Sequence, residues 1–147
     1  MATRTHEGQF RRDGITPYIV HPQGVVDILR EWGYDDEFLV VGYLHDTLEE
    51  GLTLNELKSH HEFSAEIIDA VIAITKTRRE SYDEYLNRVV ANNIAKIVKL
   101  ADIKHNLCDR PTFKQIEKYK KAVQFITHRS AATAARRQSE KRAKNQR

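Results

Sequence analysis

The chain has 147 residues, of which 40% are hydrophobic and 31% charged, as is typical of one soluble globular domain. No apolar run reaches the roughly 20 residues that cross a bilayer, and the N-terminus lacks the apolar segment of a signal peptide. The single cysteine, Cys108, cannot form an internal disulfide. We therefore expect a cytoplasmic protein without a membrane partner.

The formal net charge of +3 combines two regions of opposite sign. Residues 128–147 contain seven Lys and Arg side chains and one acid, a net +6 (seven minus one), which leaves −3 (three minus six) for residues 1–127. A basic segment can contact nucleic acid, but this one lacks interleaved aromatic residues and a reading motif. We predict a domain at 1–127 and a basic tail at 128–147, helical or disordered, with at most weak nucleic-acid contacts.

Apolar residues recur at helical spacing through most of the chain, which predicts an all-α fold without strands. The prolines at 17 and 22 favour an extended link, with His21 just before a helix that ends near Gly33. A second helix is expected to begin at Asp35 or Asp36 and to continue into the segment 45–50. Further helix starts are expected at Thr53, Ser64, Ser81 and Ile94, and a last helix carries Ile116, Tyr119, Val123 and Ile126.

Two charged clusters lie within these apolar helices. The first, His45–Glu50, holds an imidazole and three carboxylates, and the second, Lys99–Asn106, contains Asp102. Residues three and four apart share a helix face, so we expect His45 beneath Glu49. Such a concentration of buried charge requires compensation, and a metal ion would supply it.

Two imidazoles and two carboxylates, from His21, His45, Asp46 and Asp102, would form a mixed nitrogen–oxygen site. Such a site suits Mn²⁺, Fe²⁺, Co²⁺ or Zn²⁺ better than Ca²⁺. Taken singly, each residue also has a structural interpretation: His21 could be an ordinary structural histidine, and Asp102 a surface acid paired with Lys99 or Lys104. A shared ion explains them together. The other histidines considered, His60, His61, His105 and His128, are expected to be structural or exposed.

The order of these residues resembles the HD-domain metal-dependent phosphohydrolases. The similarity is closer to the hydrolase domain of RelA/SpoT-type proteins and to their small hydrolase-only relatives, including the metazoan SpoT homologue. It covers roughly residues 4–127 and is carried by four stretches: His6–Gly14, Pro17–Pro22, His45–Glu50 and Lys99–Asn106.

The resemblance implies an HD-domain helical bundle with one Mn²⁺ held by His21, His45, Asp46 and Asp102. It implies that the acids Glu49 and Glu50 flank the attacking water and that Arg11, Arg12 and Asn106 contact the nucleotide. The implied reaction removes the 3′-diphosphate of guanosine tetra- or pentaphosphate, giving GDP or GTP and pyrophosphate.

The chain also departs from the family pattern. Glu50 stands where the family usually has Asp, and a shift of about 1 Å in a catalytic group can cost roughly a hundredfold in rate. Ile103 and Lys104 replace the usual Arg-Leu, and an extra residue precedes Pro17. Two alternatives therefore stay open: hydrolysis of another nucleotide (a nucleoside monophosphate, a deoxynucleotide or NADPH), or a non-catalytic nucleotide- or protein-binding module. The sequence gives no indication of oligomeric state.

Overall fold

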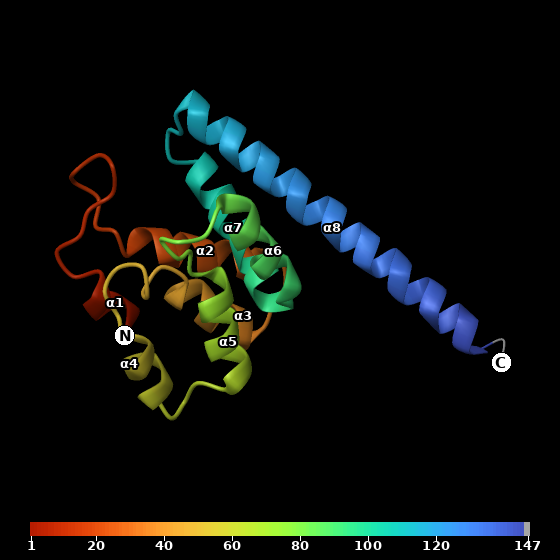
Figure 1. Ribbon diagram of the computed structural model, residues 1–147. Coiled ribbons are helices and arrows are strands. Elements are labelled where there is room, and N and C mark those ends of the chain that lie inside the picture. The colour runs from red at the N-terminus through yellow and green to blue at the C-terminus, as the bar shows by residue number, and fades with distance from the viewer. Residues whose placement is uncertain (146–147) are drawn as a thin grey trace. The chain divides into compact units, whose positions relative to one another are not determined.

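The structure is a computed structural model that describes residues 1–145. Every element in these residues is a helix, and the part of the chain described contains no strand, only one bridge between Phe10 and Pro17. The predicted all-α fold is confirmed (Figure 1). The helices are α1 (Ala2–Thr5), α2 (Val20–Glu31), α3 (Asp36–Leu44), α4 (Leu54–Ser59), α5 (Ala65–Ile74), α6 (Tyr82–Ala91), α7 (Asn93–Leu107) and α8 (Phe113–Asn145).

The chain forms two compact units, which divide after Pro111. Helices α1–α7 belong to the first unit, and the second consists mainly of the single helix α8 (Figure 1). The domain boundary expected at residue 127 falls within α8 and stays a prediction, and the last residues of the expected tail, 146 and 147, lie outside the described part. None of the described helices combines the length and apolar character needed to cross a bilayer.

The first unit is built around α2, α3 and α7, which pack on one another, while α5 packs on α3, α6 and α7. Gly42 of α3 allows a close approach to α2, since a Cβ atom there would lie 2.9 Å from Leu29 Cδ1 and 3.1 Å from Val26 Cγ2. Each fully buried aliphatic side chain contributes about 1.5–3 kcal/mol relative to exposure. Fully buried core residues include Val25, Val26, Leu29, Val41, Leu57, Val71, Val89 and Val98.

Helix starts follow the predicted capping pattern. Thr53 and Ser81 each form a capping box with the glutamate three residues later, and Ser64 accepts a hydrogen bond from the backbone of Ile67. Asn92 caps α7 in the same way by accepting from Ala95 N at 2.9 Å. These side chains satisfy N–H groups that have no partner within the helix. The Asn92 cap fixes the residue at which α7 begins. This starting point determines the face of the helix on which each of its polar residues lies.

Two expected boundaries are wrong. Helix α2 begins at Val20, so His21 lies in its first turn and not in an extended link; the first turn tolerates Pro22, whose missing N–H would have no helical partner there. Helix α3 ends at Leu44, and residues 45–51 form turns. It ends there because Thr47 Oγ1 donates to the Leu44 carbonyl (2.7 Å) and His45 Nδ1 lies 2.7 Å from the Gly42 carbonyl.

Candidate metal centre

The four residues predicted as metal ligands come together from three separate segments. His21 is on α2, His45 and Asp46 are on the turn after α3, and Asp102 is on α7. His21 Nε2 lies 3.3 Å from His45 Nε2 and 3.1 Å from Asp102 Oδ1. Asp46 Oδ2 lies 3.1 Å from His45 Nε2 and 3.6 Å from His21 Nε2. We refer to these four side chains as the ligand cluster.

The ligand cluster has the donors and the burial that a divalent cation requires. His21, His45 and Asp102 are 1%, 3% and 5% exposed, and each offers a donor atom within 4.8 Å of the others. Asp46 is not part of this three-residue group, but its Oδ2 lies within 3.6 Å of both imidazole Nε2 atoms. Imidazole nitrogens with carboxylate oxygens are a donor set suited to first-row transition metals. The residues therefore fit a divalent metal site.

The electrostatics of the ligand cluster favour positive charge at its centre. Burial alone would lower the pKa of His45, but the carboxylates of Asp46 and Asp102 raise it to about 9. Burial would likewise raise the pKa of Asp46, but His45 beside it holds that pKa below the usual range. The same holds for Asp102, whose pKa is lowered mainly by Lys99 and then by the histidines. Both carboxylates are thus ionised and ready to hold a cation.

A second layer of side chains orients the carboxylates. Lys99 Nζ donates to Asp102 Oδ2 at 2.7 Å and Asn106 Nδ2 donates to Asp102 Oδ1 at 2.5 Å. Tyr18 Oη donates to Asp46 Oδ2 at 2.7 Å, and burial raises the pKa of this phenol, so it stays protonated. Asp102 is therefore paired with Lys99, as the structural interpretation of its sequence context suggested, and it also faces the two histidines.

The acidic pair, Glu49 and Glu50, follows the ligand cluster on the same turn but is more exposed. Glu49 Oε1 accepts a hydrogen bond from Lys76 N at 2.6 Å, and burial together with Asp46 raises the pKa of Glu49. Glu50 Oε2 accepts from Gln9 Nε2 at 3.1 Å, and Gln9 Oε1 lies 2.9 Å from His6 Nδ1. Side chains from other segments therefore fix the orientation of both acids.

Of the three predicted substrate-binding residues, Arg11 and Asn106 lie beside the ligand cluster. Asn106 contacts Asp102, and its Oδ1 accepts from Arg11 Nη2 at 3.4 Å. Arg11 also donates through Nε to Asp109 Oδ2 at 2.9 Å. Arg12 lies exposed on the loop that follows. A pocket of about 210 Å³ opens here, lined by Arg11, Thr16, Val20, His105, Cys108 and Asp109.

Sequence reasoning missed His105, which was expected to be structural or exposed. It is half-buried, and its Nδ1 lies 2.9 Å from His21 Nδ1. The available signal was its position three residues after Asp102, which places both side chains on the same side of α7. Tyr18 was also missed as a partner of Asp46, although it lies within the stretch Pro17–Pro22 that carries the resemblance.

Comparison with known proteins agrees with this geometry. A sequence family described as the HD domain matches residues 1–145. A guanosine-3′,5′-bis(diphosphate) 3′-pyrophosphohydrolase of Vibrio cholerae is 36% identical, with 73% of this chain and 16% of the relative covered. A chloroplastic putative GTP diphosphokinase of Arabidopsis thaliana is 35% identical (78% and 15% covered), and a probable GTP pyrophosphokinase of Mycobacterium leprae is 33% identical (86% and 17%).

The chain spans only about a sixth of the length of these relatives. The match to the HD-domain family covers residues 1–145, which include the ligand cluster, and the all-helical fold and the buried histidine–aspartate group agree with that family. The chain therefore belongs to the HD-domain family and is similar to RelA/SpoT-type enzymes.

Proposed function

We propose that the protein hydrolyses the 3′-diphosphate of guanosine tetra- or pentaphosphate, releasing pyrophosphate and GDP or GTP, with Mn²⁺ as its native metal. The observation that carries this proposal is the convergence of His21, His45, Asp46 and Asp102 beside two further acids. The name of the Vibrio cholerae relative describes this hydrolysis, whereas the Mycobacterium leprae relative is named as a GTP pyrophosphokinase.

In this proposal His21, His45, Asp46 and Asp102 hold the ion. When bound, a divalent ion supplies Lewis-acid chemistry, which lowers the pKa of water and polarises a phosphoryl oxygen. These four side chains would leave the ion accessible to water and substrate. Lys99 and Asn106 keep Asp102 in place through their hydrogen bonds, a support that is common around metal-binding carboxylates.

The acidic pair supplies proton transfer. A carboxyl group with a raised pKa is a better general base near neutral pH than an ordinary one, and the pKa of Glu49 is raised by burial. Glu49 is therefore the residue we assign to proton removal from water. Glu50, held by Gln9, would carry a proton to the leaving group. The hydrogen bond from Gln9, on the N-terminal loop, would hold the carboxylate of this side chain, which is one methylene longer than Asp.

Two arginine side chains would bind the nucleotide. Arg11 is near the ligand cluster and is held by Asp109 and Asn106, so a phosphate would replace Asp109 as its acceptor. Guanidinium groups bind phosphate with paired hydrogen bonds. Arg12, more exposed, would contact a more distal part of the nucleotide. The pocket between Arg11 and Asp109 is smaller than the 300–1,000 Å³ typical of whole ligands and would accept one group of the nucleotide.

The experiment is product identification with protein stripped of metal and then supplied with Mn²⁺. Guanosine tetraphosphate should yield GDP and pyrophosphate in a one-to-one ratio, and the metal-free protein should yield neither. A parallel panel should contain a nucleoside monophosphate, a deoxynucleotide and NADPH. Release of inorganic phosphate from one of these nucleotides, with guanosine tetraphosphate left intact, would show that this nucleotide is the substrate in place of guanosine tetraphosphate. No hydrolysis of any nucleotide would instead favour a binding module.

A further inference from the structure

We infer that His105 is a positioning residue, which holds the imidazole of His21 so that its Nε2 faces the ligand cluster. The inference rests on the proposed metal site and goes beyond it, because His105 is not one of the four proposed ligands. Two separate observations support it: a histidine–histidine contact and a glycine that makes room for the His105 ring.

The first observation is the orientation of His21. Its Nε2 is the atom near His45 Nε2 and Asp102 Oδ1, whereas its Nδ1 lies 2.9 Å from His105 Nδ1. An imidazole that gives the Nε2 lone pair to a metal must carry its proton on Nδ1. In the buried position of His21 this N–H needs an acceptor, because an unpaired buried donor costs about 1–3 kcal/mol. His105 Nδ1 is placed to be that acceptor.

The acceptor role defines the state of His105. A neutral imidazole has one donor and one acceptor nitrogen. If Nδ1 accepts from His21, the proton of His105 is on Nε2. Metal-binding histidines commonly donate their second N–H to a carboxylate or a backbone carbonyl. Here a second histidine takes that place, so helix α7 would support the metal twice: directly through Asp102 and indirectly through His105 and His21.

The second observation is Gly24 on α2. A Cβ atom at this position would lie 2.1 Å from His105 Nε2 and 2.2 Å from His105 Cδ2. No side chain larger than hydrogen can occupy this position without displacing the imidazole ring. Gly24 does not have a left-handed backbone conformation that would itself explain a glycine. The close approach therefore gives Gly24 a role in seating His105 against α2, three residues after His21.

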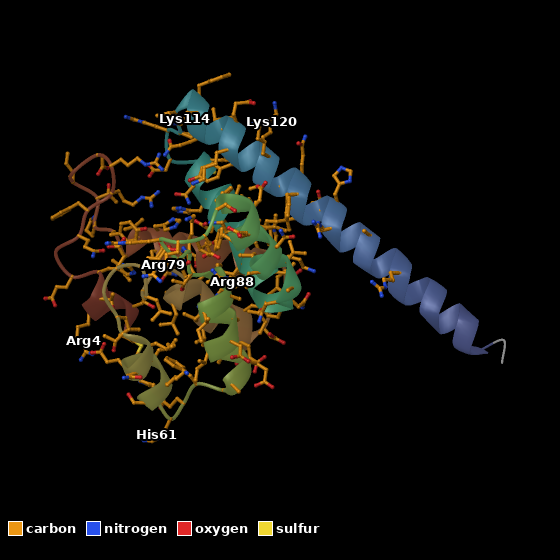
Figure 2. The ribbon with its side chains drawn as sticks, viewed as in Figure 1. Arg4, His61, Arg79, Arg88, Lys114 and Lys120 are labelled. Carbon is orange, nitrogen blue, oxygen red and sulfur yellow. The ribbon has the colours of Figure 1, made fainter. Side chains whose placement is uncertain are left out.

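The test compares metal affinity in four full-length variants. His105→Leu removes the acceptor, whereas His105→Asn keeps an oxygen near the position of Nδ1. Gly24→Ala keeps the His105 side chain but displaces its ring. His61→Leu is the matched control, since His61 is exposed and lies beyond the end of α4, away from α7 in Figure 2. Each metal-free variant is titrated with Mn²⁺ by calorimetry and with Co²⁺ by its visible absorption.

We expect His105→Leu and Gly24→Ala to weaken Mn²⁺ binding by about 10–100-fold, the usual effect of losing such a support. Both variants should also alter the visible absorption band of bound Co²⁺. By contrast, His105→Asn should recover most of the Mn²⁺ affinity, and the Mn²⁺ affinity of His61→Leu should equal that of the unmodified protein. Melting temperatures of the metal-free variants report any effect on folding, and the Leu–Asn comparison remains decisive if both melt lower. Equal Mn²⁺ affinity in His105→Leu and His105→Asn would overturn the inference. Absence of Mn²⁺ binding by the unmodified protein would instead refute the proposed metal site.

Discussion

The ligand cluster and the acidic pair share the turn after α3, which carries His45 and Asp46 as well as both acids, but the fold holds the two groups differently. His21, His45 and Asp102 are buried among α2, α3 and α7, and the carboxylates are fixed by Lys99 and Tyr18. Glu49 and Glu50 lie more exposed on a turn, held by one hydrogen bond each to Lys76 and Gln9. The comparison indicates that the candidate metal ligands are built into the core, whereas the acids to which we assign proton transfer depend on loops that can be tuned separately.

The greatest loss of metal binding and hydrolysis should follow a substitution in the buried ligand cluster. Asp102→Asn should abolish measurable Mn²⁺ binding and hydrolysis, a loss greater than the roughly 100-fold caused by removing an outer support. The substitution should also destabilise the fold, because Lys99 loses its carboxylate partner. The expected loss in the free energy of unfolding is smaller than the about 3–5 kcal/mol of breaking a fully buried pair, since the Lys99 side chain is partly exposed. Calorimetry and chemical denaturation measure the two effects. Asp69→Asn, an exposed acid on α5, is the control, and retained Mn²⁺ binding in Asp102→Asn would contradict the ligand assignment.

A substitution in the acidic pair should affect hydrolysis without affecting metal binding. Glu49→Gln should lower kcat by about 10²–10⁴-fold, the usual contribution of general acid–base catalysis. Its Mn²⁺ affinity should stay close to that of the unmodified protein, because Glu49 is outside the ligand cluster. Steady-state kinetics and calorimetry on the same preparation measure both quantities. A parallel loss of metal affinity would show that the two regions are not independent.

A smaller effect is expected at the support of the acidic pair. Gln9→Leu removes the donor that holds the Glu50 carboxylate while keeping a similar side-chain volume. The resulting misplacement should lower kcat, by less than the roughly hundredfold that accompanies a 1 Å shift, and should leave Mn²⁺ affinity unchanged. Kinetics of Gln9→Leu and of Gln9→Glu, which cannot donate when ionised, provide the measurement. If both variants keep full activity, Glu50 does not depend on Gln9.

The mildest probe is the pH profile at saturating Mn²⁺. A general base acts in its ionised form, and burial raises the pKa of Glu49 above the 4.5 of an ordinary glutamate. Activity should therefore be complete above this raised pKa and should fall as the pH drops through it, so the acid limb of kcat has its midpoint above 4.5. Glu49→Gln should lack this limb. An acid limb that persists unchanged in Glu49→Gln would assign it to another group.

The features predictable from the sequence were those encoded locally. Capping residues such as Ser64 and Ser81 mark helix starts through their own hydrogen bonds. The segments that supply His21, His45 and Asp102 could be recognised because polar residues interrupt apolar helices there. The end of α3 could not be predicted, since no proline or glycine marks a helix end between Leu44 and Gly51, and the helix is ended by contacts of His45 and Thr47.

Apart from the ligand cluster, contacts between distant segments were not accessible from the sequence. The pair of His105 with His21 depends on the packing of α7 against α2, and the need for Gly24 appears only when the two helices are placed together. The bond from Gln9 to Glu50 likewise joins residues 41 positions apart. Such relations follow from tertiary packing, which spacing along a single helix does not reveal.

The central claim is that four side chains from three segments hold one divalent cation. The most direct measurement is anomalous X-ray diffraction from crystals of the protein grown with Mn²⁺. We expect one strong anomalous peak within bonding distance of His21 Nε2, His45 Nε2, Asp46 and Asp102. A peak elsewhere, or none at this position with Mn²⁺ in excess, would contradict it.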